Sequence, residues 1–448
     1  MNKILRPFKF GAMQSVKDFE DAMRAEGIDL PCQEDVSALK QSVRIGDRDI
    51  PNRLAIHPCE GFDGFTDGKP SPRIFRRYGR YARGGAGMIW FEAISVCEDG
   101  ICNPHQLIIN DDNLEALRRL VAHTDEEAMK AWGRKPYKVI QLTHSGRSAV
   151  DRDWNPRPLI AFENPHIDRF YRNITVASDA RIEELEQQMI HAAWLAAEAG
   201  FDAVDIKLCH NYIMRELLSA FTRPGKYGGS FENRTRFVRN VVAGIREKCG
   251  DRIALASRLN AYDCLPYPYG WGMVQQEGVM QYDLTEPIQL MKMLAKEGMR
   301  LFNISTMMPR YSPLDTGYVD HYEGKAVLNP YQSTATLLKA TRELKQAVPD
   351  AVLVATGLSW FNRFGANVGA GGVQQGWFDI AGFGRQAFAY PDFARDILEK
   401  GEMVGRKCCV NCDKCYDLID FHENSGCVVR DSEEYLPLYQ RGYARSQG

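Results

Sequence analysis

The chain has 448 residues, of which 44% are hydrophobic and 25% are charged, and its formal net charge is −2. This composition is ordinary for a globular protein, and the balanced charge argues against a nucleic-acid partner, which normally meets a basic patch. No long uncharged apolar stretch occurs, so we expect no membrane-spanning helix. Residues 1–13 carry Lys3, Arg6 and Lys9 but no apolar core of a signal peptide, so we expect a cytoplasmic protein.

Residues 1–45 are charged and weakly patterned, and we interpret them as an N-terminal extension with a short amphipathic helix from Val16 to Glu26. From residue 52, short apolar runs alternate with longer amphipathic stretches. Such runs are typical of parallel strands buried on both faces, and their alternation with helices indicates βαβ units. The eight runs that we expect to be strands are 53–57, 87–92, 138–143, 203–207, 253–258, 301–305, 352–356 and 379–384.

Helical patterns separate most of these runs, at 113–123, 182–199, 233–248, 287–297 and 333–347. Eight repeats predict an α/β fold that closes into a (β/α)8 TIM barrel over residues 46–400, followed by a cysteine-rich tail at 401–448. The alternative, a doubly wound sheet with a dinucleotide site, needs G-x-G-x-x-G directly after a strand. Its nearest candidate, at residues 369–372, lacks the last glycine and follows no strand, so we reject it.

Polar residues stand where several predicted strands end, which is where a barrel of this kind forms its active site. Gln141 lies near the end of the third strand, and its amide both donates and accepts hydrogen bonds, as the pyrimidine edge of a flavin requires. Arg258 ends the fifth strand, where a cation suits the N1 and O2 positions of a reduced flavin. The alternatives are a satisfied polar loop residue for Gln141 and an ion pair that closes the barrel layer for Arg258.

Two hydrogen-bond donors, His210 and Tyr212, follow the fourth strand. Two donors near one point can hold a carbonyl oxygen and stabilise a developing enolate, and a tyrosine hydroxyl can supply a proton. The alternative is a structural loop histidine beside a tyrosine that packs under the next helix.

Glycines, a serine and an arginine follow the seventh and eighth strands. Loops at these places form the common phosphate site of barrels, where glycine exposes backbone N–H groups and arginine adds a bidentate donor. The alternative is a pair of tight turns with a solvated arginine. The residues concerned are Gly357, Ser359, Gly384 and Arg385.

Four stretches, taken together and in this order, resemble the old yellow enzyme family. They are 84–89 (GGAGMI) with Glu92-Ala93, 141–147 (QLTHSGR), 200–207 (GFDAVDIK) and 227–234 (YGGSFENR), and the last two are the most specific. The resemblance covers roughly residues 45–430. It is closer to the iron–sulfur branch of the family, the barrel half of bacterial 2,4-dienoyl-CoA reductase and trimethylamine dehydrogenase.

The resemblance implies that FMN lies across the barrel mouth and passes a hydride from N5 to the β-carbon of an activated alkene. It implies that Gln141 and Arg258 contact the isoalloxazine ring. His210 falls at the second position of the family's substrate-binding pair, and Tyr212 falls at its proton-donating tyrosine. The residues implied to line the ring are His57, Pro58 and Ala93, and those implied to hold the phosphate are Gly357, Ser359, Gly384 and Arg385.

The first position of that pair departs from the family, because it holds Lys207 where the family has histidine. A lysine binds a carboxylate or an enolate as a point charge, so this residue favours an acidic substrate. Alternatively, Lys207 forms a salt bridge with Asp205 or Glu216. Asn211 follows His210 where the family usually has glycine, which is expected to alter the turn.

The tail has cysteines Cys409, Cys412, Cys415 and Cys427 with the spacing C-x2-C-x2-C-x11-C. Three close thiolates wrap one face of a [4Fe–4S] cluster, whereas structural zinc prefers two separated C-x-x-C pairs. The spacing therefore favours a cluster over zinc and over free thiols. Related enzymes have a slightly longer gap before their second cysteine, which makes Cys408 a rival first ligand.

A cluster carries one electron at a time, so its presence beside FMN implies an electron relay. The larger relatives hold a second flavin in a C-terminal region, and this sequence ends at Gly448. We therefore expect electrons from a separate partner, a ferredoxin or a flavoprotein, with NAD(P)H as a direct or indirect donor. The expected reaction is reduction of an activated C=C bond in an unsaturated carbonyl or carboxylate, with a proton from Tyr212 and with His210 and Lys207 polarising the acceptor.

Two other functions stay open. One is oxidative dehydrogenation or demethylation of an amine, with the cluster exporting electrons and an aromatic cage holding the cation. The aromatic residues available for a cage are Trp90, Tyr267, Tyr269, Trp271 and Trp360. Lys207 argues against a cationic substrate. The other function is an electron-transfer subunit without its own substrate, and the oligomeric state, a homo-oligomer included, is open as well.

Overall fold

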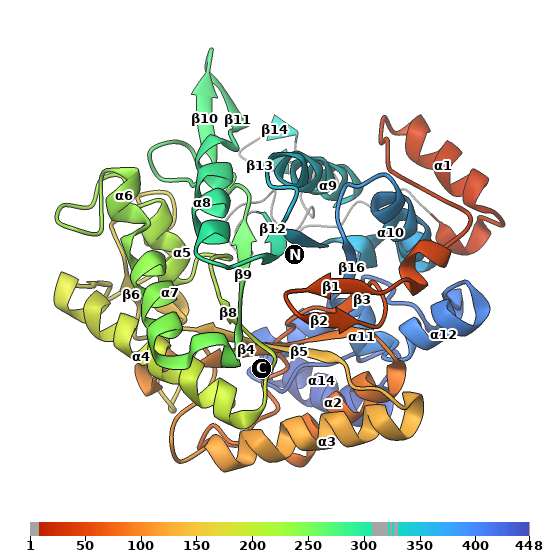
Figure 1. Ribbon diagram of the computed structural model, residues 1–448, viewed down its shortest axis with the longest axis horizontal. Helices are drawn as coiled ribbons and strands as arrows, with labels where there is room; N and C mark the ends of the chain where they lie inside the picture. Colours follow the sequence, from red (N-terminus) through yellow and green to blue (C-terminus); the bar gives the residue numbers. More distant parts are fainter. Residues whose placement is uncertain (1–8, 307–320, 323–324, 327–329, 448) are drawn as a thin grey trace.

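The computed structural model describes residues 9–306, 321–322, 325–326 and 330–447, and it shows a closed barrel of eight parallel strands surrounded by helices (Figure 1). The barrel strands are β3 (Leu54–Ile56), β4 (Met88–Ser95), β5 (Tyr137–Thr143), β8 (Ala203–Ile206), β9 (Ala254–Asn260), β12 (Leu301–Ser305), β15 (Val352–Ala355) and β16 (Ile380–Phe383). They follow one another in this order around the barrel, and β16 closes the ring by pairing with β3. The predicted (β/α)8 barrel and its eight strands are confirmed.

The barrel strands are apolar runs because both of their faces are covered. Every residue of β3, β4, β5, β8, β12 and β16 is buried. Two strands continue past the predicted residues, β4 to Ser95 and β9 to Asn260. These added residues lie at the carboxyl ends, where the loops that carry a barrel's site begin.

Helices cover the outside of the barrel, and the five predicted helical segments are present with longer or shifted boundaries. The helices after the extension are α2 (Pro72–Gly84), α3 (Leu114–Trp132), α4 (Asp179–Ala199), α5 (Ile213–Leu218), α6 (Phe231–Arg234), α7 (Arg236–Cys249), α8 (Thr285–Lys296), α9 (Pro330–Ala347), α10 (Gly365–Gln374), α11 (Arg385–Ala389) and α12 (Phe393–Lys400). Residues 369–372 lie inside α10 and not in a turn after a strand, which agrees with the rejection of a dinucleotide-binding motif there.

Helix α2 is absent from the sequence-based prediction. Five of its 13 residues are arginines, so its composition does not stand out as a core-facing helix. It starts with a serine cap at Ser71 and a proline in its first turn, and it ends at Gly85 in the left-handed conformation. These are ordinary start and stop signals.

The N-terminal extension contributes helix α1 (Val16–Ala25), which confirms the predicted helix. Ser15 caps it in a capping box with Asp18. Phe19 is fully buried and stacks on Phe364, just before α10, with ring centroids 4.8 Å apart. The extension therefore packs into the main core; its residues 1–8 lie outside the described part of the chain.

A hairpin of β1 (Val43–Ile45) and β2 (Arg48–Ile50) closes the N-terminal end of the barrel. Its apolar side chains form one cluster with residues from the barrel strands, including Met88 and Leu301. The boundary that we propose between extension and barrel, at residue 45, falls at the turn of this hairpin. The proposed boundary at residue 400 coincides with the end of α12.

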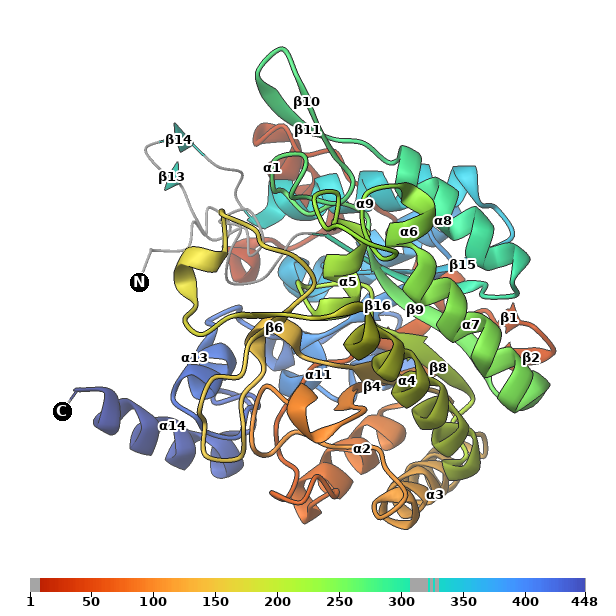
Figure 2. The ribbon, with the colours of Figure 1, turned by 90° about the vertical axis from the view of Figure 1, so that its left-hand side faces the viewer.

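The tail, residues 401–448, contains helices α13 (Lys414–Asp420) and α14 (Ser432–Gln447), and Figure 2 shows α14 extending away from the barrel. The remaining short strands are β6 (Leu159–Ile160), β7 (Thr175–Val176), β10 (Met273–Gln276), β11 (Val279–Tyr282), β13 (His321–Tyr322) and β14 (Lys325–Ala326). Among the described residues, no helix combines the length and the apolar character needed to span a membrane.

Candidate active site and cluster pocket

The predicted site residues come together at one end of the barrel, because parallel strands direct their carboxyl ends to the same side. His57 and Pro58 follow β3, Ala93 lies in β4, Gln141 in β5, Lys207, His210 and Tyr212 follow β8, Arg258 lies in β9, Gly357 and Ser359 follow β15, and Gly384 and Arg385 follow β16. This end of the barrel is therefore the candidate active site.

His57 is held at the mouth in a neutral form. Its Nε2 lies 3.0 Å from the carbonyl oxygen of Ala355, and its Nδ1 lies 2.8 Å from the amide nitrogen of Asn303. Nε2 therefore donates a hydrogen bond and Nδ1 accepts one. Burial, followed by the charge of Arg258, lowers the pKa of His57 to about 3. Asn303, in β12, is a site residue that the sequence did not single out, since a lone asparagine in an apolar strand carries no motif.

Asp205 organises the neighbouring wall of the mouth. Its buried carboxylate accepts hydrogen bonds from the Gln141 amide at 2.6 Å, the Trp90 indole at 2.8 Å and the Arg258 backbone N–H at 2.6 Å. Burial raises the pKa of Asp205, and these donors oppose that effect. The side-chain oxygen of Gln141 and Nε of Arg258 are buried without a hydrogen-bond partner in the described part of the chain. One buried acceptor and one buried donor are thus left for a bound group.

The turn after β8 is left-handed at two consecutive residues, His210 with φ 61° and Asn211 with φ 58°. Asparagine tolerates this conformation better than most residues, so the turn forms without the family's glycine. Nε2 of His210 lies 2.9 Å from the hydroxyl oxygen of Ser305. Burial, and then the charges of Arg258 and Lys207, hold the pKa of His210 well below its usual range. His210 therefore enters the site as an uncharged hydrogen-bonding group.

Lys207 pairs with a carboxylate that the sequence did not suggest. Its Nζ lies 3.0 Å from Oε1 of Glu60, in the loop after β3, and 3.6 Å from the ring centroid of Tyr212. The Lys207 side chain is only 2% exposed. The lysine thus lies between a carboxylate and the π face of the predicted proton donor.

The predicted alternative of a salt bridge from Lys207 to Asp205 or Glu216 is wrong. Asp205 receives the three donors described above instead. Glu216 pairs with Arg147 at 2.7 Å, and both side chains are buried. Local sequence spacing suggested these partners, whereas the actual one lies 147 residues away.

The loops after β15 and β16 meet at the predicted phosphate end. Gly357 has a φ of 97°, a left-handed conformation that favours glycine. The hydroxyl oxygen of Ser359 accepts a hydrogen bond from the backbone N–H of Gln386 at 3.4 Å. Gly384 directly precedes α11. Both loops therefore bring glycine backbone to one place, as a phosphate site requires.

Arg385 is directed toward the tail. It forms an ion pair with Asp413, and its guanidinium carbon lies 4.6 Å from the ring centroid of Trp360. It also lines the pocket that contains the tail cysteines. Arg385 thus belongs both to the predicted phosphate end and to the cluster pocket.

The four predicted cluster cysteines line one pocket. The other lining residues come from α11 and from the residues next to the cysteines in the sequence. They include Phe388, Val410, Asp413, Val429 and Arg430. Cys408 is fully buried outside this lining, and its thiol donates to the carbonyl oxygen of Val404 at 3.6 Å. Between the two rival first ligands, the structure therefore favours Cys409.

The tail thiols do not form a compact group of metal ligands in the described residues. Bonds of about 2.3 Å in a tetrahedral site put neighbouring sulfurs about 3.8 Å apart. In the described residues, the one group of at least three candidate ligands whose atoms all lie within 4.8 Å of one another is Cys97, Asp99 and His144, away from the tail. No three of the described tail cysteines therefore form a group as compact as a set of zinc ligands.

The group Cys97, Asp99 and His144 does not have the chemistry of a metal site. Nδ1 of His144 accepts from the Gly146 N–H at 2.9 Å, so the proton lies on Nε2, the atom a metal would need. Arg181 donates to Asp99 at 2.8 Å and approaches the Cys97 sulfur at 3.9 Å. A guanidinium thus already provides the cation for these side chains.

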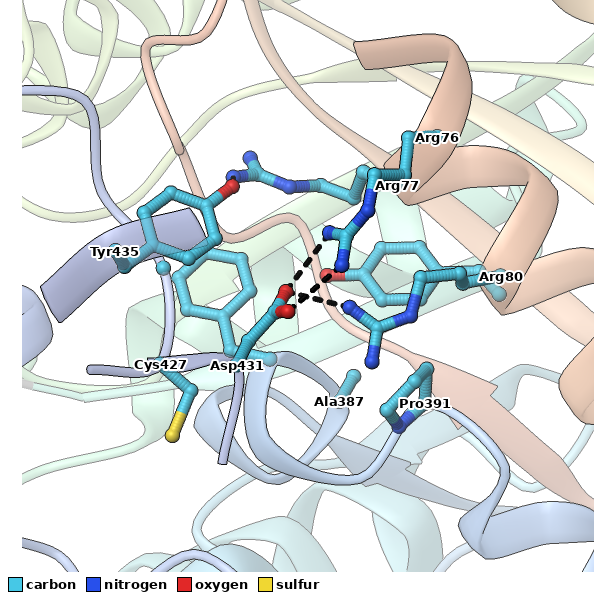
Figure 3. Close-up of a pocket in the computed structure, with 11 residues that line it drawn as sticks. Arg76, Arg77, Arg80, Ala387, Pro391, Cys427, Asp431 and Tyr435 are labelled. Atoms are coloured by element: carbon cyan, nitrogen blue, oxygen red, sulfur yellow. Dashed lines mark hydrogen bonds and ion pairs between the residues drawn. The ribbon is translucent and has the colours of Figure 1, made fainter. Parts of the chain in front are cut away.

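Arginines of α2 hold the tail against the barrel. Figure 3 shows Asp431 between Arg76, at 2.7 Å, and Arg80, with the thiol of Cys427 pointing away from both arginines. Arg77 is buried and connects the tail to the barrel side. Its partners are Asp63, the carbonyl oxygen of Ser425 at 2.6 Å and the hydroxyl of Tyr435 at 2.9 Å. The unpredicted helix α2 is therefore the platform for the cysteine segment.

Comparison with known proteins identifies the barrel. Residues 39–402 match the NADH:flavin oxidoreductase / NADH oxidase family. The chain belongs to this family. The matched region contains every predicted flavin and substrate residue of the mouth, so the family match supports an FMN-binding barrel. The match ends before the tail cysteines and therefore gives no information about a cluster.

Several curated relatives cover parts of the chain. An NADPH dehydrogenase of Bacillus pumilus is 34% identical over 203 residues, which are 44% of this chain and 56% of the relative. An NADH oxidase of Thermoanaerobacter brockii is 26% identical over 387 residues, which are 83% of this chain and 52% of the relative. The chain therefore spans little more than half the length of these relatives.

Solved structures share the fold. A 2-naphthoyl-CoA reductase in complex with 2-naphthoyl-CoA has a TM-score of 0.72 at 22% identity, covering 88% of this chain and 57% of that one. Histamine dehydrogenase from Rhizobium sp. 4-9 has a TM-score of 0.67 at 22% identity, and the match covers 88% of this chain and 52% of that one. An old yellow enzyme homologue from Zymomonas mobilis has a TM-score of 0.60 at 20% identity, and the match covers 82% of this chain and 94% of that one.

Proposed function

We propose that this chain is an FMN-dependent enzyme that reduces an activated C=C bond in an α,β-unsaturated carbonyl or carboxylate, with electrons relayed through a [4Fe–4S] cluster. The observation that carries the proposal is the barrel mouth, where Lys207, His210 and Tyr212 lie on one turn beside two buried polar atoms without partners. Membership of the family supports NADH or NADPH as the direct or indirect source of electrons.

The mouth fits FMN. The oxygen of Gln141 offers a buried acceptor and Nε of Arg258 a buried donor, which matches the mixed hydrogen bonding of a flavin's pyrimidine edge. The walls beside the ring would come from His57, Pro58 and Ala93, and the phosphate would be held by Gly357, Ser359, Gly384 and Arg385. FMN, when bound, supplies hydride to the β-carbon of the alkene.

The residues after β8 do the remaining chemistry in this proposal. Tyr212 donates a proton to the α-carbon. His210, which is neutral, and Lys207 donate hydrogen bonds to the acceptor oxygen and stabilise the charge that develops there. Because Lys207 is almost fully buried, its ammonium acts through a low local dielectric and its influence on that oxygen is strong.

The tail supplies the second cofactor site. Cys409, Cys412, Cys415 and Cys427 are proposed to hold the cluster, which when bound passes one electron at a time. The shared position of Arg385 supports a short route between the two cofactors. We propose that a ferredoxin or a flavoprotein delivers the electrons from outside this chain.

The test is an anaerobic absorption spectrum with iron and acid-labile sulfide measured on the same sample, followed by alkene reduction with an artificial one-electron donor. We expect flavin bands, about four irons per chain, and a saturated product. Flavin without iron would contradict the proposed cluster and would favour direct reduction of the flavin by NAD(P)H. Absence of flavin after anaerobic reconstitution would contradict the central proposal.

Amine oxidation has less support in the mouth. Trp90 and Trp271 are fully buried, and their indole N–H groups are bonded to Asp205 and to the carbonyl oxygen of Asn260. Trp360 lies against Arg385. Three of the five aromatic residues available for a cation cage are therefore engaged elsewhere. If the enzyme oxidised an amine and reduced an artificial electron acceptor, the proposed direction of electron flow, into the flavin and on to the alkene, would be wrong.

A further inference from the structure

Glu60 and Lys207 form a pair across the barrel mouth. Glu60 follows β3 and Lys207 follows β8, two strands that are not neighbours in the barrel. The two charged atoms lie 3.0 Å apart, and the side chains are 20% and 2% exposed, respectively. The carboxylate is therefore the accessible half of the pair, and the ammonium behind it is almost completely dehydrated.

The ammonium of Lys207 has three N–H groups. In the described residues, one hydrogen bond goes to Glu60, and the ring of Tyr212 receives the cation at 3.6 Å from its centroid. Capacity for a further hydrogen bond is left on Nζ, beside His210, whose pKa the lysine charge helps to lower. An acceptor oxygen of the substrate could use this capacity without displacing Glu60.

Charged groups of both signs lie around Lys207. Arg258 is a further cation, Glu60 and Asp205 are carboxylates, and the two histidines, His57 and His210, are uncharged. Burial is the main cause that raises the pKa of the Cys209 thiol, in the loop after β8, and the charge of Glu60 adds to this effect. A carboxylate bound at Lys207 would place a second negative charge beside Glu60, whereas a carbonyl oxygen adds no charge.

We propose that Glu60 determines the substrate class by acting as the counter-ion of Lys207. Glu60 excludes free carboxylates and selects neutral α,β-unsaturated carbonyl compounds, that is ketones, aldehydes, esters or thioesters. This inference rests on the proposed function and narrows it. Like charges brought together in an interface cost enough to change binding by ten-fold or more, and the partial exposure of Glu60 keeps the expected effect at the lower end.

The experiment compares two substrates that differ only in this charge, cinnamate and methyl cinnamate. Reduction adds hydride to the β-carbon and a proton to the α-carbon, and two equivalents of an artificial one-electron donor supply the electrons. We expect the wild-type enzyme to prefer the ester. In Glu60→Gln the ratio of kcat/KM for acid over ester should rise about ten-fold or more, mainly through a lower KM for the acid.

Two further variants separate charge from structure. Glu60→Asp keeps the carboxylate and should retain the wild-type preference. Lys207→Gln removes the cation but leaves Glu60, so it should discriminate against the acid more strongly than the wild type does. Glu115→Gln changes an exposed carboxylate on α3 and should leave both kcat/KM values unchanged.

Binding without turnover keeps the inference separate from the proposed function. Saturated 3-phenylpropanoate and its methyl ester are titrated against the holoenzyme, with flavin absorption as the signal. The ratio of their Kd values should change in Glu60→Gln in the same direction as the kinetic ratio, even if neither alkene is reduced. A wild-type preference for the acid, or a ratio that is the same in wild type and Glu60→Gln, would overturn the role of Glu60. Loss of alkene reduction with that binding shift intact would instead overturn the proposed reaction.

Discussion

Arg385, in the loop after β16, forms an ion pair with Asp413, which lies between Cys412 and Cys415 of the tail. The loop predicted to hold the FMN phosphate is thus connected by one contact to the segment predicted to hold the cluster. Trp360 supports the guanidinium on one side. This ion pair joins two sites that the sequence suggested separately. Neutralising Arg385 and neutralising Asp413 should therefore shift the reduction potential of the cluster in opposite directions.

We expect Arg385→Gln to weaken FMN binding and to lower the reduction potential of the cluster. Loss of a charge-assisted hydrogen bond to phosphate should raise the FMN Kd about ten-fold or more, and removal of a nearby positive charge disfavours the reduced cluster. Fluorescence titration and an EPR-monitored redox titration measure the two effects. Asp413→Asn should raise the potential and should not weaken FMN binding. If the cluster potential shifted in the same direction in Arg385→Gln and in Asp413→Asn, the proposed position of this ion pair beside the cluster would be contradicted.

Cys409 and Cys408 are adjacent residues with different predicted roles. Cys409 lines the cluster pocket, whereas the Cys408 thiol donates to the Val404 carbonyl away from it. We expect Cys409→Ser to lose most of its iron and Cys408→Ser to keep about four irons per chain. Iron and acid-labile sulfide assays after anaerobic purification check this. The reverse result would make Cys408 the first ligand.

Glu92 should make stability depend on pH. Burial raises its pKa to about 7, although the charge of Arg77 opposes this. The folded state therefore binds a proton that the unfolded state has already released, and the free energy of unfolding should fall as pH rises from about 4.5 to about 7, by at most about 1.4 kcal/mol per pH unit. Above that window this contribution is constant.

Chemical denaturation of wild type and Glu92→Gln across pH 5 to 8 measures this effect. The variant keeps a hydrogen-bonding side chain without the titration, so its stability should depend less on pH. Glu115→Gln on the exposed face of α3 is the matched control and should keep the wild-type slope. Parallel curves for wild type and Glu92→Gln would show that Glu92 does not titrate in this range.

The barrel could be predicted from the sequence because its strands are buried on both faces and read as apolar runs. The site residues after β8 and β16 could be placed for the same reason, since parallel strands bring their ends together. Helix α2 could not be predicted, because its arginines are satisfied by partners far along the chain. Arg76 and Arg80 meet Asp431, which lies more than 350 residues away.

The partners of the site residues were also beyond the sequence. Glu60 and Asn303 contact Lys207 and His57 across the barrel, and no spacing in the chain indicates either pair. The choice between Cys408 and Cys409 depends on the direction of each thiol, which a spacing rule cannot give. Composition and order thus indicate where groups gather, whereas tertiary packing decides which of them touch.

Tyr212→Phe separates the proposed enzyme from a chain that only transfers electrons. Tyr212 directly precedes helix α5, and its ring packs against the Lys207 ammonium, which lies 3.6 Å from the ring centroid. Phenylalanine can therefore keep this packing and lose only the hydroxyl. We expect alkene reduction to fall about 10²- to 10⁴-fold, with FMN content, iron content and reduction by the artificial donor unchanged. Tyr267→Phe, at a tyrosine that is 56% exposed, should retain full activity. Unchanged turnover in Tyr212→Phe would remove this residue as the proton donor, and a wild-type chain that exchanges electrons but reduces no alkene would favour the electron-transfer subunit.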